Sequence, residues 1–300
     1  MKKYFLLLCL MVNACMMAAT GVTYTKADSV KVVTMLANGG KEYAKNKQLN
    51  LMLYYGKKLQ GVPYVASTLE VNKKEQLVVN LRQLDCTTFV ETVFALTLTT
   101  RQGSVAWTDY LRNLETIRYA NGKAEGYTSR NHYFLWWVEQ NKKKGLITTP
   151  MDDAMAKRVA SGKSLPSYIR KQIINIDYMS THSSAYPMLK GNTADIATIA
   201  AKEKNSKGKT MYYVPAAQTG LSKKYLGLYI KDGDILAIAT KKKGLDTTHI
   251  GIASWGKDGK LHLLNASQVR GKVVLEPMTL QQYMKKHPTQ LGVWVLHPTE

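Results

Sequence analysis

Cysteine is scarce in this sequence. Only Cys9, Cys15 and Cys86 are present, and the first two lie in an N-terminal apolar segment. A disulfide framework needs several cysteines in the folded part of the chain, so that class of small stapled domain is excluded. Cys86 remains as a free thiol, which in an exported protein is a liability unless it has a use. The alternative is an inert, buried apolar side chain, as most lone cysteines are.

Acidic residues are also few. The chain has 21 Asp and Glu against 42 Lys and Arg, which gives a net charge of +21. Such an excess favours anionic partners, among them nucleic acid, acidic glycopeptides and lipid surfaces. The lysines come in short runs beside turn signals, as at 142–144 and 241–243, without a basic helix or a stacked-aromatic pattern. We therefore expect no nucleic-acid partner.

Apolar runs are short everywhere, and the one near the N-terminus follows two lysines and precedes small residues. It is too short to span a bilayer comfortably and predicts a signal peptide over residues 1–19. We expect an exported protein, in the periplasm or at the outer membrane of a Gram-negative bacterium. The stretch 12–15 also resembles a lipoprotein cleavage box, in which the signal ends at residue 14 and a lipidated Cys15 attaches the protein to a membrane.

The sequence has no linker rich in Pro, Gly or Ser, no low-complexity tract and no internal repeat. Residues 20–300 therefore predict a single domain, with a long insertion at about residues 100–230. Residues 28–60 are typical of a helix, and the aromatic run at 132–138 is typical of a core. The remaining histidines lack metal-ligand spacing, so we expect no metal and no cofactor: His132, His182, His287 and His297.

The stretch from residue 84 to residue 98 organises the rest of the chain. Asp85 is a good helix N-cap, and apolar residues then recur at helical spacing through Leu98. Cys86 is placed in the first turn of a buried helix. Because the positive end of the helix dipole favours the thiolate, we expect the pKa of Cys86 to be lowered.

The last third of the chain predicts strands at 233–239, 249–255 and 261–266, with a turn at Lys257-Asp258-Gly259. If the turn is a three-residue loop with Gly259 in the left-handed conformation, Gly251 faces Asn265 across the hairpin. His249 and Asn265 then share one face as diagonal neighbours. A loop of two or four residues puts them on opposite faces.

The face of the second strand that carries His249 also carries Gly251 and Ala253, so a helix can lie close over it. We expect the helix that begins at Cys86 to do so. Cys86 is then the nucleophile, His249 the general base and later the acid, and Asn265 the residue that orients the ring. His262 is the competing third member.

Several motifs together resemble the NlpC-type papain-like cysteine peptidases of bacterial cell walls, and more narrowly a branch described as N-acetylmuramoyl-L-alanine amidase-like. Each motif is weak alone, but their order and spacing are specific. They are Gly61-Val62-Pro63-Tyr64 with Thr68-Leu69-Glu70, Leu84-Asp85-Cys86-Thr87-Thr88-Phe89-Val90-Glu91, Ile117-Arg118-Tyr119 with Gly122, Ser129-Arg130 with His132-Tyr133, Gly233-Asp234-Ile235, Asp246-Thr247-Thr248-His249-Ile250-Gly251-Ile252 and Asn265-Ala266-Ser267.

The resemblance implies an α+β, papain-like NlpC-type fold in which the helix that carries the cysteine packs on an antiparallel sheet, with a family-specific insertion. It implies Cys86 as nucleophile and His249 as base. Asn265 stands where the family usually has a histidine. Tyr64 corresponds to a tyrosine whose hydroxyl steadies the oxyanion, with a turn tyrosine packed on the core as the alternative. Arg130 and Ser129 resemble substrate contacts, with an exposed salt bridge as the alternative for Arg130.

The function that this resemblance implies is a monomeric cell-wall cysteine amidase. Its substrates are soluble, including anhydro, muropeptides, and it hydrolyses the amide bond between N-acetylmuramic acid and L-alanine. One alternative is an endopeptidase that cleaves the stem peptide between D-glutamate and the diamino acid. Another is a non-catalytic, muropeptide-binding lipoprotein.

Overall fold

The computed structural model describes residues 21–299. The expected signal peptide and Cys15 lie outside these residues. None of the helices among the described residues is long and apolar enough to cross a membrane.

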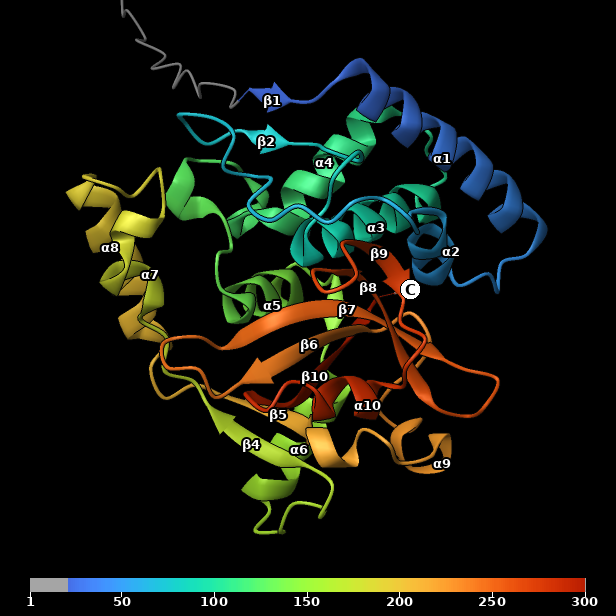
Figure 1. The fold of residues 1–300 in the computed structure, drawn as a ribbon, viewed down its shortest axis with the longest axis vertical. Helices are drawn as coiled ribbons and strands as arrows, with labels where there is room; N and C mark the ends of the chain where they lie inside the picture. The colour runs from blue at the N-terminus through green and yellow to red at the C-terminus, as the bar shows by residue number, and fades with distance from the viewer. Residues whose placement is uncertain (1–20, 300) are drawn as a thin grey trace, which may run out of the picture.

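Among the described residues, two helices precede Cys86 in the sequence, one begins at Cys86, and the others follow it (Figure 1). The described residues contain α1 (Lys26–Lys45), α2 (Leu51–Lys58), α3 (Cys86–Arg101), α4 (Trp107–Arg118), α5 (Phe134–Lys143), α6 (Pro150–Ala160), α7 (Tyr178–Thr181), α8 (Thr193–Ser206), α9 (Lys223–Leu226) and α10 (Leu280–Lys285).

The main sheet is antiparallel throughout, with strand order β4-β5-β10-β6-β7-β8-β9 and β3 paired to β10. A separate short parallel pair joins β1 to β2. The described strands are β1 (Val22–Thr23), β2 (Leu77–Val78), β3 (Ile147–Thr148), β4 (Arg170–Ile173), β5 (Thr210–Pro215), β6 (Ile235–Thr240), β7 (Thr247–Trp255), β8 (Leu261–Ser267), β9 (Lys272–Leu275) and β10 (Gln290–Pro298). This mixture of helices with an antiparallel sheet confirms the α+β class.

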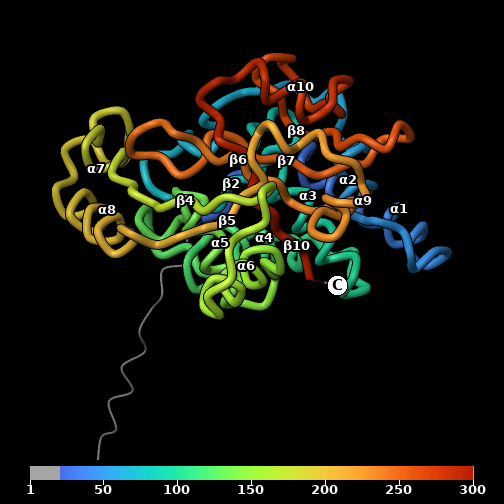
Figure 2. Tube along the Cα trace, turned by 90° about the horizontal axis from the view of Figure 1, so that it is seen from below, coloured from blue at the N-terminus to red at the C-terminus, as the bar shows by residue number. Residues whose placement is uncertain are grey.

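Helices cover both faces of this sheet, because its strands are apolar on both sides. Side chains of α2, α3 and α5 form one core with Ile250 and Ile252 of β7. Side chains of α6, α9 and α10 form a second core with Ala253 of β7 and Leu263 of β8. Figure 1 shows α1 to α4 in the upper part of the view and α6, α9 and α10 in the lower part. Figure 2 shows α7 and α8 at one end of the molecule and α1 at the other.

Helix α3 is the central helix of the larger core and contacts α1, α2, α4, β7 and β8. Asp85 caps it as expected, since its side chain accepts a hydrogen bond from the Thr88 main-chain N–H at 2.8 Å. Thr88 Oγ1 in turn accepts from the Asp85 N–H at 2.9 Å. Each fully buried large apolar side chain, such as Phe89, contributes roughly 1.5–3 kcal/mol to this packing. The Asp85 cap and the buried apolar side chains of α3 together determine where the helix begins. They therefore determine the position of Cys86.

The β7–β8 hairpin has the predicted three-residue loop. Gly256 N–H donates to Lys260 O at 2.8 Å, and Gly259 has a φ of +71°. Ile252 is opposite Leu264, and one further step along this register brings Gly251 opposite Asn265. The loop length, and with it the shared face of His249 and Asn265, is confirmed.

Helix α3 lies on the opposite face of β7 from the one we expected. It packs with Ile252 and Leu264, and a Cβ atom at Gly56 of α2 would lie 2.7 Å from Leu264 Cδ2 on this same side. The strip that contains Gly251 is covered instead by Leu263. A Cβ atom added at Gly251 would lie 2.7 Å from Leu263 Cδ1. The expectation failed because the large side chains of the other face bury more apolar area than the small strip can.

Two other expectations have clear outcomes. The stretch 28–60 is largely helical, as expected, and is divided into two helices because Asn46 ends α1 and Asn50 caps α2. The aromatic run at 132–138 is core, as expected, since α5 buries its first turns. Within residues 100–230, α4 packs on α3 and β5 joins the main sheet beside β10, so this part of the chain is continuous with the rest of the fold. Its description as an insertion stays a prediction.

Candidate active site

Cys86 is the first residue of α3 and lines a cavity of about 210 Å³. Its nearest side-chain partner is Thr87, whose Oγ1 lies 3.9 Å from the thiol sulfur. Its main-chain N–H makes no hydrogen bond to any described residue. The other lining residues come from β7 and the turn before it, and from segments further away in the sequence: Thr87, Asn131, His132, Tyr133, Phe134, Trp137, Met179, Tyr186, Leu245, Asp246, Thr247, Thr248, His249 and Ile250.

His249 and Asn265 are joined by a hydrogen bond of 2.9 Å between the ring Nε2 and the amide Oδ1. The Asn265 Nδ2 faces the main-chain oxygens of Leu263, at 3.3 Å, and Val274, at 3.5 Å. Since Nδ2 must donate to these carbonyls, Oδ1 is the atom that faces the ring, and it can only accept. Nε2 of His249 therefore carries the proton, and Nδ1 is left with a free lone pair.

Tyr283 of α10 lies against the His249 ring, with centroids 6.3 Å apart and planes inclined by 27°. Burial raises the pKa of Tyr283 to about 12, and the nearby Glu276 and Cys86 add to this rise. Our reading of the sequence missed this residue. No local signal marks it, because it approaches β7 only through the packing of α10.

The site favours the neutral forms of both central groups. Burial, helped by the neighbouring Asp85 carboxylate, raises the pKa of Cys86 to about 11, and the main-chain N–H groups of Ile250 and Thr87 offset only part of this rise. Burial also lowers the pKa of His249. The expected lowering of the Cys86 pKa was therefore wrong, because desolvation of the thiolate outweighs its stabilisation at the helix N-terminus. The resting pair is a thiol beside a neutral imidazole.

Tyr64 is held beside Cys86 by main-chain hydrogen bonds at Tyr64 and at the next residue. Its N–H donates to Gly271 O at 2.9 Å, and the next N–H, of Val65, donates to Leu84 O at 3.1 Å. Burial raises the pKa of Tyr64 to about 12, with Cys86 and Asp85 contributing. No described residue bonds its hydroxyl group, so this donor stands free next to Cys86.

Arg130 and Ser129 are engaged with the protein itself. The Arg130 guanidinium is buried and lies 2.6 Å from Glu70 and 3.3 Å from Glu75. Ser129 Oγ donates to Gly126 O at 2.7 Å and accepts from the Glu125 N–H at 2.9 Å. Arg130 therefore does not form the exposed salt bridge we considered. Contact of either residue with a substrate stays a prediction.

His262, the competing third member, does not meet His249. Its Nδ1 donates to Glu276 O at 3.0 Å, and its Nε2 lies 3.5 Å from the Asp258 carboxylate. Asn265 is thus the residue that the fold brings to the imidazole.

His132 was read from the sequence as an ordinary polar position, but it lines the Cys86 cavity. The one sequence signal that marks it is the motif of Ser129-Arg130 with His132-Tyr133. Its position depends on the chain segment before α5, which the sequence alone does not orient.

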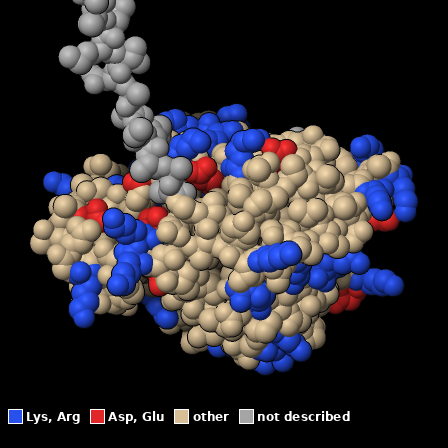
Figure 3. All heavy atoms as spheres, turned by 90° about the horizontal axis from the view of Figure 1, so that it is seen from above, with Lys and Arg blue, Asp and Glu red and all other residues tan. Residues whose placement is uncertain are grey.

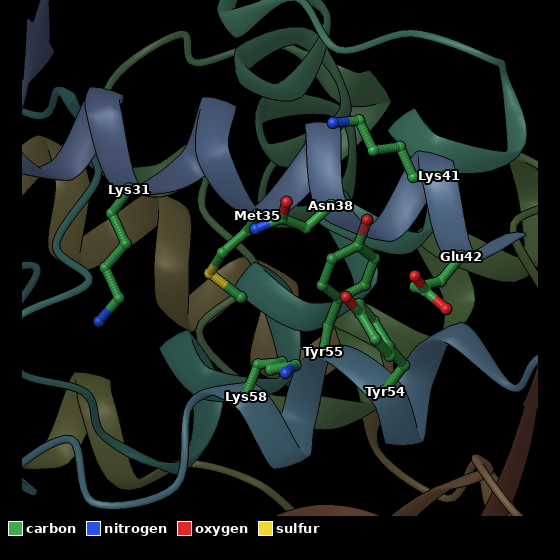
Figure 4. Close-up of a pocket in the computed structure, with 8 residues that line it drawn as sticks. All are labelled: Lys31, Met35, Asn38, Lys41, Glu42, Tyr54, Tyr55 and Lys58. Atoms are coloured by element: carbon green, nitrogen blue, oxygen red, sulfur yellow. The ribbon is translucent and has the colours of Figure 1, made fainter.

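A larger cavity lies elsewhere, between α1 and α2, with a volume of about 510 Å³ (Figure 4). Lysines, a glutamate and tyrosines line it, without a nucleophile beside a base, so it does not resemble a catalytic site.

Within residues 21–299 no cluster of three or more His, Cys, Asp or Glu side chains is arranged to hold a metal ion. On the face drawn in Figure 3, Lys and Arg form separate groups rather than a continuous stripe.

The family model that matches this chain and a similar solved structure name the same kind of protein. Residues 54–293 match the model of the N-acetylmuramoyl-L-alanine amidase-like family. A solved structure of an N-acetylmuramoyl-L-alanine amidase from Bacteroides uniformis is 36% identical, covers 88% of this chain and 100% of its own, and superposes with a TM-score of 0.72. A structure from Bacteroides fragilis, whose name proposes a xylanase, is 38% identical, covers 82% of this chain and 99% of its own, and has a TM-score of 0.70.

A third structure, of protein LPG0564 from Legionella pneumophila, is 21% identical, with a TM-score of 0.63, and covers 91% of this chain and 97% of its own. At that identity it shows a shared fold alone. No curated protein matches the chain in sequence.

Proposed function

The chain belongs to the N-acetylmuramoyl-L-alanine amidase-like family, and from this premise we propose that it is a cysteine-dependent amidase of the cell wall. Its substrate is a muropeptide, with or without an anhydro end, and the bond that it hydrolyses joins the muramoyl lactyl group to L-alanine. Cys86 is the nucleophile, His249 the base and acid, and Asn265 the residue that fixes the imidazole.

The observation that carries this proposal is the hydrogen bond from His249 Nε2 to Asn265 Oδ1. It fixes one tautomer and leaves Nδ1 as the only ring atom able to take a proton. Cys86 lines the same cavity and supplies the proton. A thiol, an oriented base and a free N–H are what acyl transfer requires.

The reaction begins when His249 Nδ1 takes the thiol proton as the sulfur attacks the carbonyl carbon. The developing oxyanion accepts hydrogen bonds from the Cys86 main-chain N–H and the Tyr64 hydroxyl. Nδ1–H then protonates the leaving amine, the C–N bond breaks, and the stem peptide departs from a thioester. A water molecule gives a proton to Nδ1 and attacks the thioester, and the sulfur leaves as a thiol after it regains that proton.

Mass spectrometry of muropeptides tests the proposal, using the signal-free protein and its Cys86→Ala variant. We expect release of an intact stem peptide that begins at L-alanine, and no release by the variant. Products that begin at the diamino acid instead assign an endopeptidase. No product from any muropeptide contradicts catalysis and favours a binding protein.

The cellular location belongs to the same proposal. We infer export to the periplasm or the outer membrane of a Gram-negative bacterium, because the substrate is found there and residues 1–19 have the pattern of a signal peptide. Labelling of cells with a radioactive fatty acid tests attachment through Cys15, since a Cys15→Ala variant loses the label only if that residue is lipidated.

A further inference from the structure

A second cavity, of about 400 Å³, adjoins the one that contains Cys86. Four residues line both cavities, namely Thr87, Asn131, His132 and Tyr186. The two spaces are therefore neighbours across these side chains. A substrate whose reacting carbonyl lies at Cys86 has room to extend into the second space.

His132 presents an unused acceptor between these cavities. Its Nε2 bonds Tyr127 O at 2.8 Å, and because a carbonyl can only accept, Nε2 carries the proton. Nδ1 then holds a lone pair, and no described residue donates to it. Burial and the nearby Arg130 charge hold the pKa of His132 well below its usual value, so the ring is neutral at physiological pH.

Asn131 presents a complete amide without partners. The residue is 8% exposed, and neither Oδ1 nor Nδ2 finds a hydrogen bond among the described residues. Unpaired buried amides are rare because their desolvation costs free energy that no protein contact returns. The bound substrate is a natural source of the missing partners.

An ion pair lines the second cavity beside Asn131 and His132. Arg130 binds Glu70 Oε1, and the other oxygen, Oε2, is left without a hydrogen bond at the edge of the second cavity. We call Glu70, Arg130, Asn131 and His132 the polar wall. Its unpaired atoms are both acceptors and donors. The acceptors are Glu70 Oε2, Asn131 Oδ1 and His132 Nδ1, and the donors are Arg130 Nε and Asn131 Nδ2. The matching ligand chemistry is a secondary amide, which offers one N–H and one carbonyl.

We propose that the polar wall is a binding subsite for a secondary amide of the substrate close to the scissile bond, with His132 Nδ1 accepting its N–H and the Asn131 side chain pairing with the group. This deepens the proposed function and rests on it. The amide comes either from the acetamido group of the sugar or from the next peptide bond of the stem. The chemistry is the same in both cases.

Two isosteric variants test His132. Glutamine places an amide near the position of Nε2 and keeps the bond to Tyr127, whereas asparagine places a polar atom near Nδ1 and loses that bond. We expect His132→Gln to raise KM about tenfold, as loss of one hydrogen bond does, with thermal stability close to that of the parent. We expect His132→Asn to keep KM within about threefold, at lower thermal stability. A purely structural role predicts the reverse, with His132→Gln normal and His132→Asn impaired.

Binding measured without turnover separates this subsite from catalysis. In the Cys86→Ala background, calorimetry with a muropeptide should show a Kd about tenfold weaker when His132→Gln is added. An unchanged Kd overturns the subsite even if the parent enzyme cleaves muropeptides. A parent that binds the muropeptide through His132 but never cleaves it contradicts the proposed function alone.

A truncated substrate identifies the amide. N-acetylmuramoyl-L-alanine without further stem residues keeps the acetamido group and lacks the next peptide bond. A His132→Gln defect that persists on it assigns the acetamido group, and a defect that disappears assigns the stem peptide. A variant that is indistinguishable from the parent on both substrates overturns the proposal.

Discussion

Cys86, His249 and Asn265, which we propose as the catalytic residues and call the catalytic corner, differ from the polar wall beside them in how their polar atoms are paired. In the corner, Asn265 uses both ends of its amide on the protein, and His249 is held at Nε2. In the wall, Asn131 has no partner at either end, and Glu70 has one free oxygen. This difference is what the two proposals require. Groups that hold one geometry through a reaction are fixed by the protein, whereas groups proposed to bind a substrate are left with unpaired donors and acceptors.

The largest expected effect comes from removing the nucleophile. Cys86→Ala should lower kcat by at least about 10⁴-fold, because no acyl-enzyme can form. Stability should change little, since the side chain is small and partly exposed. The test combines turnover of a muropeptide with thermal unfolding. Residual turnover of even a tenth of the parent rate would remove Cys86 from the reaction.

The ion pair that supports the polar wall should dominate its stability. Arg130→Met removes the buried cation that faces Glu70 and Glu75. Breaking such a buried ion pair costs about 3–5 kcal/mol of unfolding free energy. The matched control is Arg112→Met, whose pair with Asp109 is exposed and should not measurably affect unfolding. Urea unfolding measures both. Equal effects would show that the wall does not depend on its buried charges.

Removal of the orienting amide should act on both catalysis and stability. Asn265→Ala leaves the His249 N–H without its partner, so we expect kcat to fall by about 10- to 100-fold and unfolding free energy to fall by about 1–3 kcal/mol. His262→Ala is the control and should keep kcat within about twofold, because His262 bonds Glu276 instead. If His262→Ala were the more damaging variant, the third member would have to be reassigned.

The smallest effect is a shift in the pH profile. Because the pKa of His249 is lowered, the base stays neutral at lower pH, and kcat/KM should rise with pH through a value below 6.5. Because the pKa of Cys86 is raised to about 11, the thiol stays protonated and no alkaline loss should occur near pH 8.5, where an ordinary cysteine of pKa about 8.5 is half ionised. Rates of alkylation by iodoacetamide give the thiol pKa directly. A value below 7 would indicate a resting ion pair and contradict the neutral pair.

Much of the catalytic corner was predictable because its determinants are local. Asp85 caps the helix that starts at Cys86 through a residue three positions away. The sequence allowed a three-residue loop around Gly259 beside loops of two or four residues. With the three-residue loop, period-two alternation puts His249 and Asn265 on one face, so local turn chemistry and periodicity account for their pairing.

The polar wall was not predictable in the same way. Arg130 pairs with Glu70 across 60 positions of sequence, and the motif alone did not indicate that this ion pair would be buried. His132 lies in the site only because the chain before α5 passes beside α3. No periodicity or turn signal encodes such contacts, which depend on how distant segments pack.

The sequence by itself determined the helix that begins at Cys86, the hairpin register that pairs His249 with Asn265, and the α+β class, because caps, loop lengths and side-chain alternation act over a few residues. Only the tertiary structure decided which face of the sheet α3 covers, how Tyr64 and Tyr283 approach the site, and how far burial raises the pKa of Cys86. The physical reason is that desolvation and packing depend on every segment that closes around a group, whatever its distance along the chain.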